Sequence, residues 1–351
     1  YNYTKSIPQN IIDSFYEKYG PEADFHQKTG SSSSGMLNAG MQLYWLKNTK
    51  PEVFKKIRYS LHLPQYLSFV FTGIPLSEYT SIGCHTSLWD FEKRDYHDWV
   101  YAENLDQILP PIVSTETSIN MNYNGKRIKI GVGIHDSSAA LLPYVRSLKN
   151  QFILISTGTW SIALNPFVER TLSKKDVADD CINYMRINGK PVKSARLFLG
   201  NEYSIQVKKL TEYYQVDKDY HKTVKFDPEI HYEIVKEFEK IFKWESIEDP
   251  EMPEETHLRY TSFDHAYHHL MMELVLLQVE SIKSAKGNMT IEKLFVDGGF
   301  SDNDIYIHLL SHHFRTMELR TTDSSLGSAL GAAICISDTQ LNSKFLKKNY
   351  S

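Results

Sequence analysis

The chain has 351 residues, 41% of them hydrophobic and 23% charged, with a formal net charge of -4 at pH 7; this length predicts two domains of roughly 150 residues each. Its 39 Lys and Arg are matched by 43 Asp and Glu without a basic block, and no apolar run approaches the roughly 18 residues of a membrane span, which argues against nucleic-acid and membrane partners. The three cysteines lie far apart and form no C-x-x-C pair, so we expect no disulfide framework and a cytoplasmic protein.

The first hundred residues read mainly as packing elements. Helical patterns are expected near residues 11–18, 37–47 and 51–59, and the apolar segment 61–72 is closed by a glycine. A loop over residues 80–89 contains Cys84 and His85. Zinc sites need three or four N or S ligands, and no second Cys/His pair at ligand spacing lies nearby, so we predict no metal ligands here. The charged, Trp-rich segment 90–100 is expected to form a short helix.

A strand over Ile128–Ile134 is predicted by alternating apolar residues, and it ends at His135 and Asp136. Ser137 and Ser138 are typical N-cap residues, and a helical run follows, so the acid lies on a strand-to-helix turn. Such turns carry the reactive groups of many α/β enzymes. An ordinary helix cap remains the alternative.

A second strand-to-turn transition follows closely. Residues 152–155 form an apolar strand, residues 156–159 a small polar turn, and residues 160–164 the returning strand. Gly158 lets the backbone approach an anion, and the hydroxyls of Thr157 and Thr159 can donate to phosphate. Most glycine-containing hairpin turns bind nothing, so a plain hairpin is the alternative.

Three later elements also place glycines at helix entrances or between helices. Gly200 precedes a helix expected over residues 202–214, where a simple turn glycine is favoured over a nucleotide contact. The strand 291–296 runs into Gly298 and Gly299, with Ser301 or Asp302 expected to cap a helix over 304–314. The small-residue helix 326–334 is expected to pack closely against a neighbour.

Amphipathic helices are expected over residues 228–243 and 263–284. The second contains His265, His268 and His269, but the H-E-x-x-H metal motif is absent, so we predict packing or solvated roles for these imidazoles.

Four motifs in this order resemble those of the FGGY carbohydrate kinases: the acid at a strand end, S-T-G-T-W, D-G-G-F-S-D-N and G-S-A-L-G-A-A. Two further segments, L-P-Q-Y-L-S-F-V-F-T-G and A-R-L-F-L-G-N-E-Y, are also similar to the family, so the resemblance covers most of the chain. It implies an α/β protein with the two-domain actin-like (ribonuclease H-like) ATPase fold. Residues 1–150 would belong to the sugar-binding domain and residues 151–351 to the nucleotide-binding domain.

The resemblance also assigns roles to residues. Asp136 matches the catalytic base that accepts the proton of the sugar hydroxyl, and His135 becomes a sugar contact beside it. The hairpin residues Thr157, Gly158 and Thr159 would hold the β- and γ-phosphates of ATP. The adenosine site would be lined by Gly200, Gly298, Gly299 and Asn303. Mg²⁺ would be carried by the phosphates, with no protein ligand.

Within the family, H-D-S-S-A and S-T-G-T-W-S are most similar to the kinases of deoxy-ketoses, the rhamnulokinases and fuculokinases. We therefore expect an ATP-dependent kinase of L-rhamnulose or L-fuculose. Xylulose, ribulose or a polyol is the alternative substrate, and a sugar or nucleotide sensor without catalysis is the alternative from another class. Oligomeric state is not indicated.

One departure from the family concerns the start of the chain. The family's D-x-G-T/S hairpin, which helps to hold phosphate and Mg²⁺, does not occur in this sequence, and the first residue is Tyr1. We expect that an N-terminal segment of the natural protein is missing, so that the first domain is incomplete and catalysis by this chain is impaired.

Overall fold

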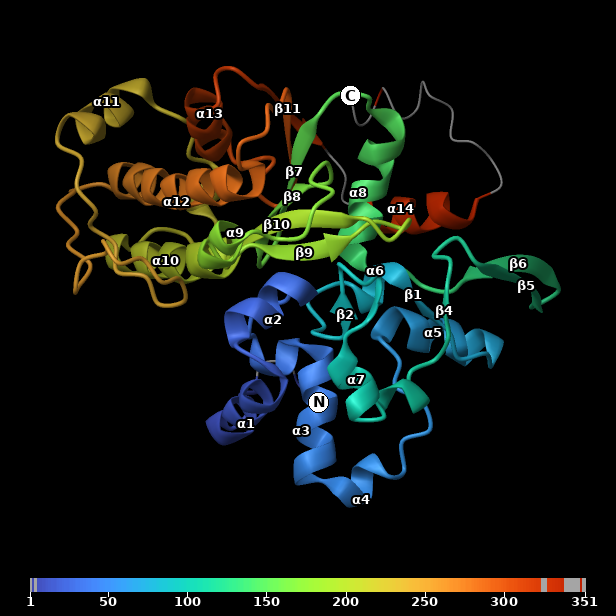
Figure 1. Ribbon diagram of the computed structural model, residues 1–351. Helices are drawn as coiled ribbons and strands as arrows, with labels where there is room; N and C mark the ends of the chain where they lie inside the picture. Colours follow the sequence, from blue (N-terminus) through green and yellow to red (C-terminus); the bar gives the residue numbers. More distant parts are fainter. Residues whose placement is uncertain (1, 3–4, 323–326, 338–347, 349–351) are drawn as a thin grey trace. The chain divides into compact units, whose positions relative to one another are not determined.

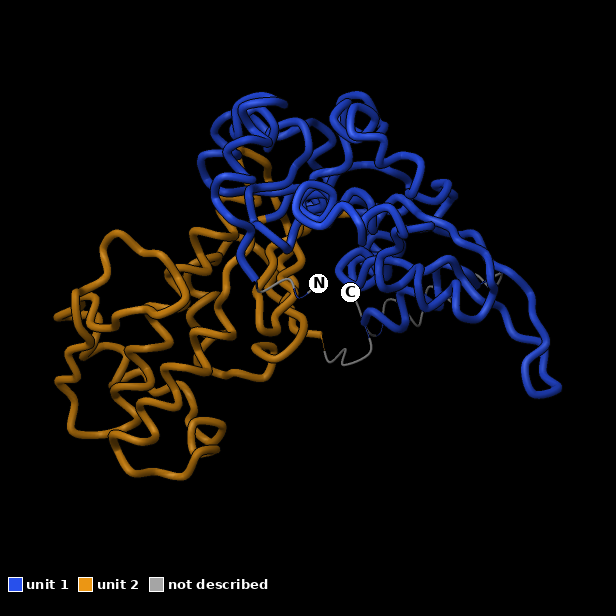
Figure 2. Tube along the Cα trace, turned by 90° about the horizontal axis from the view of Figure 1, so that it is seen from below, with its two compact units in different colours: residues 1–149, 165–194, 326–351 blue, residues 150–164, 195–325 orange. Residues whose placement is uncertain are grey.

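The computed structural model describes residues 2, 5–322, 327–337 and 348 (Figure 1). The chain forms two compact units (Figure 2). Unit 1 contains residues 1–149, 165–194 and 326–351, and unit 2 contains residues 150–164 and 195–325. Neither unit is a continuous stretch, because the chain passes between them four times, after residues 149, 164, 194 and 325.

The largest sheet has six strands in the order β12, β11, β7, β8, β10, β9. Their bounds are β7 Phe152–Thr157, β8 Ser161–Asn165, β9 Ile182–Met185, β10 Pro191–Leu197, β11 Lys293–Gly298 and β12 Glu318–Thr322. Strands β12, β11 and β7 run parallel, whereas β7 and β8 form an antiparallel hairpin, as do β9 and β10.

The middle of the sheet is the core of unit 2. Consecutive residues 152–155 of β7 and 294–296 of β11 are all fully buried, with 0% exposure. Because successive side chains point to opposite faces of a strand, both faces are covered. The α-helices among the described residues of this unit are α10 Leu199–Tyr214, α11 Pro228–Lys236, α12 Phe263–Lys286 and α13 Asp304–His313.

Unit 1 is built largely from helices and very short strands. Its α-helices are α1 Gln9–Tyr19, α2 Glu22–Thr29, α3 Ala39–Thr49, α4 Pro51–Phe54, α5 Leu63–Thr72, α6 Tyr79–Ile82, α7 Asp98–Ala102, α8 Asp136–Ser147, α9 Lys174–Ala178 and α14 Gly327–Ile336. The further strand pairs are β1 Ser77–Glu78 with β4 Ile112–Val113, β2 Trp89–Asp90 with β3 Asp95–Tyr96, and β5 Ser118–Tyr123 with β6 Lys126–Gly131.

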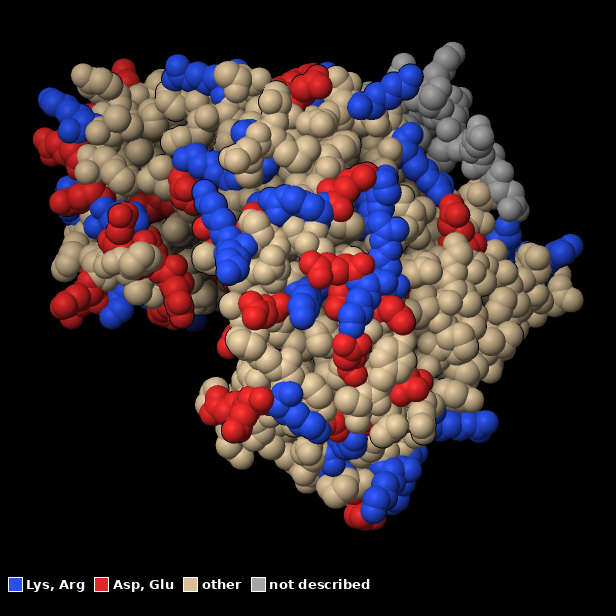
Figure 3. Space-filling view, viewed as in Figure 1, with Lys and Arg blue, Asp and Glu red and all other residues tan. Residues whose placement is uncertain are grey.

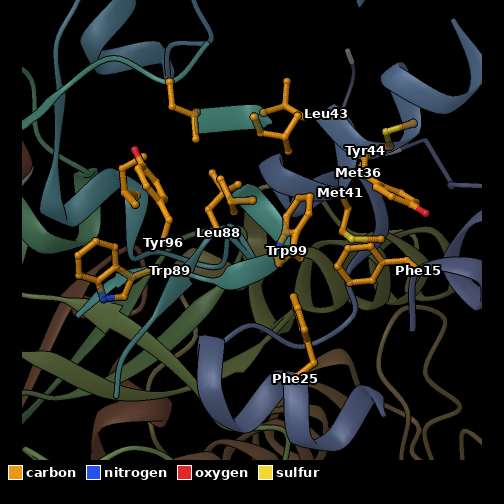
Figure 4. Close-up of a cluster of buried hydrophobic side chains, with 14 of the residues drawn as sticks. Phe15, Phe25, Met36, Met41, Leu43, Tyr44, Leu88, Trp89, Tyr96 and Trp99 are labelled. Atoms are coloured by element: carbon orange, nitrogen blue, oxygen red, sulfur yellow. The ribbon is translucent and has the colours of Figure 1, made fainter. Parts of the chain in front are cut away.

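An aromatic cluster organises the N-terminal half of unit 1 (Figure 4). Phe15 is fully buried at its centre and makes edge-on contacts with Phe25, Tyr44 and Trp99 at ring separations of 5.0 to 5.1 Å. Edge-on pairing suits the ring quadrupoles and adds about 0.5–1.5 kcal/mol per pair beyond the burial itself. The indole N–H of Trp99 donates to the backbone oxygen of Ser87 at 2.8 Å, which ties the loop after α6 to this rigid core.

Helices α8 and α14 pack against each other through small residues. A Cβ atom at Gly331 would lie 1.8 Å from the backbone oxygen of Ala139, so only glycine permits this approach. The expected close packing of the small-residue helix is therefore confirmed, and its partner is α8. Leu326, the expected first residue of that helix, lies outside the described residues.

The predicted strands and helices differ from the structure mainly at their ends. The strand over 128–134 stops at Gly131, and the helix over 228–243 stops at Lys236. Beyond Lys236 the chain is pulled away from the helix because Phe242 is fully buried, while its backbone N–H donates to the carboxylate of Glu273. The prediction of a helix over residues 90–100 is wrong. Strands β2 and β3 form an antiparallel hairpin in this segment, and only its end belongs to a helix, α7, which begins at Asp98.

The helix α5 presents an unusual amount of apolar surface. Five of its large side chains are at least half exposed: Leu63, Tyr66, Leu67, Val70 and Phe71. Figure 3 shows an area without charged side chains over α5, whereas both signs of charge are interspersed elsewhere on the same face. Across the described residues, none of the helices has the length and apolar character needed to cross a membrane.

Candidate active site

The predicted catalytic acid, Asp136, is the first residue of α8. Its side chain is 80% exposed, and Oδ1 accepts a hydrogen bond of 2.6 Å from the backbone N–H of Ser137. The hydroxyl of Ser138 does not cap the helix but is buried and donates to the backbone oxygen of Met185 at 2.8 Å. The carboxylate is thus fixed by its own helix end and open to a ligand.

His135 lies directly beside this acid. Its Nδ1 is 3.2 Å from Oδ1 of Asp136, and its ring packs edge-on against Tyr184 at 5.5 Å. Burial lowers the pKa of His135, although Asp136 and Glu78 act in the opposite direction. The imidazole is therefore neutral at physiological pH, able to donate through one ring nitrogen and to accept through the other.

A hydrogen-bonded chain that sequence reasoning missed holds the backbone of His135. Its N–H donates to Oγ1 of Thr80 at 2.9 Å, and this hydroxyl donates to the carboxylate of Glu78 at 2.8 Å. Glu78 is fully buried and also accepts from Thr115 at 2.7 Å. The only local signal is an acid placed just before the short helix α6, whose N–H groups it caps.

In unit 2, the predicted phosphate hairpin divides into a buried and an exposed part. Thr157 is buried, and its hydroxyl donates to the backbone oxygen of Asp297 at 2.6 Å and accepts from the N–H of Phe300 at 3.0 Å. It therefore joins β7 to the turn after β11. Gly158 and Thr159, at the tip, are exposed.

The predicted glycines serve two different purposes. A Cβ at Gly200 would lie 1.9 Å from the oxygen of Gly158, and one at Gly298, where φ is 90°, would lie 1.9 Å from the oxygen of Thr157. These two glycines let α10 and β11 approach the hairpin. Gly299, by contrast, has no atom within 4 Å of the position a Cβ would take, so it borders open space.

That space belongs to a cavity of about 390 Å³, which includes the predicted residues Gly299 and Asn303. Its lining consists of Tyr203, His221, Lys222, Val224, Lys225, Tyr267, Gly299, Asp302, Asn303 and Asp304. The side chain of Asn303 caps α13 and also donates to the hydroxyl of Tyr267 at 2.9 Å. The N-cap of α13 is thus Asn303, which lies one residue after Asp302 and two after Ser301, the two residues expected to cap the helix. Aromatic rings line this cavity together with two lysines and two aspartates, which suits a flat ligand with polar groups.

The two tyrosines and two lysines escaped prediction because they come from separate segments. Tyr203 lies on α10, Tyr267 on α12, and Lys222 and Lys225 on the connection that follows α10. The hydroxyls of Tyr203 and Tyr267 lie 2.8 Å apart, so the cavity wall is formed only when the helices pack.

Asp297 is a further candidate that the sequence patterns did not single out. It is 5% exposed at the end of β11, beside Ser156 of β7 and Thr322 of β12. Burial raises its pKa to about 6, although hydrogen bonds from Gly298 and Thr322 oppose the change. A buried carboxyl group with a raised pKa beside a candidate phosphate hairpin is a candidate functional residue.

The histidines of α12 have individual structural partners. His268 accepts from the backbone N–H of Asp227 at 3.0 Å, and His269 lies between the hydroxyl of Tyr260 and the backbone oxygen of Glu239. Both are buried, as expected for packing residues.

Comparison with protein families gives two matches. The FGGY family of carbohydrate kinases, N-terminal domain, matches residues 8–141, and the carbohydrate kinase FGGY, C-terminal domain, matches residues 149–233. Together the two domains of this one family account for more than half of the chain.

Curated relatives match over shorter stretches. A rhamnulokinase of Oceanobacillus iheyensis is 30% identical over 140 residues, which is 36% of this chain and 28% of the relative. A rhamnulokinase of Halalkalibacterium halodurans is 23% identical over 167 residues, 45% of this chain and 34% of the relative. The matches thus span about a third or less of these relatives.

Solved structures match over nearly the whole chain. A carbohydrate kinase from Novosphingobium aromaticivorans has a TM-score of 0.74 at 22% identity, covering 96% of this chain and 72% of that one. A ligand-bound xylulose kinase from Lactobacillus acidophilus gives 0.71 at 13%, with 97% and 71% covered. A glycerol kinase from Plasmodium falciparum with ADP gives 0.69 at 18%, with 98% and 72% covered. The predicted α/β, actin-like fold class is confirmed.

Proposed function

Because this chain belongs to the FGGY family of carbohydrate kinases, we propose that the protein transfers the γ-phosphate of ATP to a hydroxyl of a ketose. A deoxy-ketose such as L-rhamnulose or L-fuculose is the substrate we favour. Two observations support that choice: both curated relatives described above are rhamnulokinases, and the H-D-S-S motif surrounds the candidate base.

The observation that carries the proposal is the open carboxylate of Asp136 beside the neutral ring of His135. In the reaction, Asp136 accepts the proton of the sugar hydroxyl while the sugar oxygen attacks the γ-phosphorus. The bond from that phosphorus to the β–γ bridging oxygen breaks, and ADP leaves. His135 orients the carboxylate and contacts the sugar, and the buried Glu78 and Thr80 hold His135 in place.

The nucleotide would be bound by unit 2. The exposed tip at Gly158 and Thr159 would contact the β- and γ-phosphates. Thr157 would hold that tip in place through the hydrogen bonds of its hydroxyl to the end of β11 and the turn after it. The adenosine would occupy the cavity bordered by Gly299 and Asn303, where Tyr203 and Tyr267 provide apolar surface. Gly200 and Gly298 support this arrangement by permitting close backbone contact. Bound Mg²⁺ neutralises phosphate charge, and we assign it no protein ligand.

The assignment of residues 1–150 to sugar binding and 151–351 to nucleotide binding remains part of this proposal. So does the activity of the complete natural protein, because the chain covers 72% of the N. aromaticivorans kinase and less of the curated relatives.

The decisive experiment measures ADP release by the natural full-length protein with a panel of ketoses and polyols. Turnover with a deoxy-ketose should fall roughly 100- to 10,000-fold in Asp136→Asn, because the general base is lost. ATP affinity should stay unchanged, since the substitution lies outside unit 2. Asp13→Asn, which alters an exposed carboxylate on α1, is the matched control and should retain full turnover.

Other outcomes separate the alternatives. Preferred turnover of xylulose, ribulose or a polyol would keep the kinase but change its substrate. No turnover of any sugar, despite measurable ATP binding, would overturn the kinase proposal and favour a non-catalytic sensor.

A further inference from the structure

Unit 1 brings together three side chains that metal ions commonly bind. Cys84 and His85 lie in the loop after α6, and His135 lies immediately before α8. Within the described part of the chain, these residues form a group whose potential ligand atoms all lie within 4.8 Å of one another. The sequence places His135 fifty positions after His85, which is why ligand spacing along the chain did not reveal the group.

The loop that carries Cys84 and His85 is held rigidly. The backbone oxygen of His85 accepts from the side-chain amide of Asn38 at 2.8 Å, and the oxygen of Thr86 accepts from the N–H of Gly40 at 2.8 Å. His85 has a φ of 42° and Ser87 a φ of 63°, in the left-handed region that non-glycine residues seldom adopt. Such a backbone persists because its surroundings enforce it, and it frequently marks a functional site.

His135 is held equally well from the other side. Its N–H is bound by Thr80, and Asp136 Oδ1 lies 3.2 Å from its Nδ1. A carboxylate next to the ring is the usual neighbour of a metal-bound histidine, because it orients the imidazole and raises its basicity. The three side chains therefore start from fixed backbones on two separate elements.

We propose that Cys84, His85 and His135 form a binding site for a thiophilic divalent transition-metal ion such as Zn²⁺, with a fourth coordination position left to water. One sulfur and two imidazoles favour Zn²⁺ over Mg²⁺ or Ca²⁺, which prefer oxygen ligands. Binding forms a metal–thiolate bond and releases the proton of the Cys84 thiol to solvent. This site is distinct from the Mg²⁺ that accompanies ATP, and because it uses the ring of His135, metal binding competes with the sugar contact proposed for that ring.

The geometry requires only a small adjustment. With metal–ligand bonds of about 2.0–2.3 Å, the ligand atoms of a tetrahedral site lie roughly 3.5 Å apart. No separation between the ligand atoms exceeds 4.8 Å, so side-chain rotation that shortens the longest distance by up to about 1.3 Å completes the site. The ring of Tyr184 packs edge-on against both His85 and His135 and keeps the imidazoles facing the same region.

Cobalt provides a spectroscopic probe that does not depend on kinase activity. Co²⁺ is titrated into the metal-free 351-residue chain while absorbance is recorded. We expect one equivalent to produce the visible bands of tetrahedral Co²⁺ and a near-ultraviolet thiolate charge-transfer band, and Zn²⁺ to displace both. Mg²⁺ at the same concentration should leave the spectrum unchanged.

Matched variants identify the ligands. Cys84→Ser should abolish the charge-transfer band and weaken Co²⁺ binding at least 10-fold. Cys181→Ser and Cys335→Ser, which alter the other two buried cysteines, should leave the spectrum intact. His85→Asn should also weaken binding, and asparagine tolerates the left-handed backbone at this position.

A further measurement uses the unmodified protein, so its result does not depend on whether the variants fold. Zn²⁺ should slow alkylation of Cys84, located by peptide mass mapping, and should not change the alkylation of Cys181. Absence of a stoichiometric Co²⁺ spectrum, an unchanged spectrum in folded Cys84→Ser, or equal alkylation with and without Zn²⁺ would each overturn the proposal. Because none of these readouts uses phosphoryl transfer, a failure here leaves the proposed kinase reaction standing, and the reverse also holds.

Discussion

Asp297 shows how one buried carboxyl group can make the stability of the fold depend on pH. The folded protein raises its pKa to about 6, above the 3.8 of an unburied aspartate, so the folded state binds this proton more tightly than the unfolded state. Its contribution to stability is complete below about pH 4 and is lost as the pH rises through 6. Above neutral pH the carboxylate is ionised although it is buried, and the folded protein has lost this contribution to its stability.

We predict that Asp297→Asn removes this dependence. The free energy of unfolding of the variant, minus that of the unmodified protein, should be about 1–2 kcal/mol larger at pH 8 than at pH 5. The spread of this value allows for partial solvation of the group. Urea unfolding at both pH values measures the difference. Asp302→Asn, in the exposed turn that follows, is the control; an equal gain there would contradict the assignment.

Among the elements, the contact between α8 and α14 bears most directly on the candidate base. Asp136 begins α8, and the hydroxyl of Ser328 on α14 donates to its backbone oxygen at 3.2 Å. Since Gly331 lets the two helices approach each other, packing at one end of α14 determines the position of the carboxylate at the start of α8.

Gly331→Ala should therefore reduce both stability and turnover. The added methyl group would overlap the backbone oxygen of Ala139, and such overpacking costs about 1–3 kcal/mol even though alanine favours helices. The control is Ala329→Gly, at an exposed site on the same helix, which should cost about 1 kcal/mol through helix propensity while leaving turnover unchanged. Thermal unfolding and ADP release, measured on both variants, separate a displaced base from a merely weakened helix. Equal turnover in the two variants would contradict the coupling.

Elements defined by local patterns could be predicted from the sequence, and those defined by distant partners could not. The β7–β8 hairpin follows from an apolar run, a small polar turn and a second apolar run, all within fifteen residues. The end of α11 depends on Phe242, which is buried beyond it, and on Glu273 of α12, which binds the backbone there. No periodicity within residues 228–243 contains that information.

The candidate sites divide in the same way. Asp136, Gly299 and Asn303 lie at the ends of strands or helices, where glycines and helix-capping residues give a clear signal in the sequence. Tyr203 and Tyr267 become neighbours only through helix packing. The same is true of His135 and Cys84, whose association requires the loop after α6 to be folded onto the start of α8.

At the scale of the whole molecule, the apolar face of α5 should control how the chain behaves at high concentration. Contiguous exposed apolar surface promotes association, whereas isolated exposed apolar residues do not. Leu67→Glu with Val70→Glu should reduce concentration-dependent light scattering and change the free energy of unfolding by no more than about 0.5 kcal/mol, because both side chains are exposed.

The matched control for this double substitution is Tyr232→Glu on α11, where a single aromatic side chain is 69% exposed. It should leave light scattering unchanged. Scattering that falls equally in both proteins would indicate a general effect of added negative charge instead of an effect of the α5 surface.

The interrupted path of the chain also has a consequence for synthesis. Helix α8 emerges from the ribosome long before α14, since Asp136 and its partner Ser328 are 192 residues apart. Until the last segment of unit 1 has been made, the small-residue face of α8 lacks its partner, so this unit cannot complete its folding in the order of translation. Unit 2, which ends at residue 325, is finished first although it begins later. The candidate base thus reaches its final setting only after α14 has been made, which makes translation through residue 336 a condition for assembling the site.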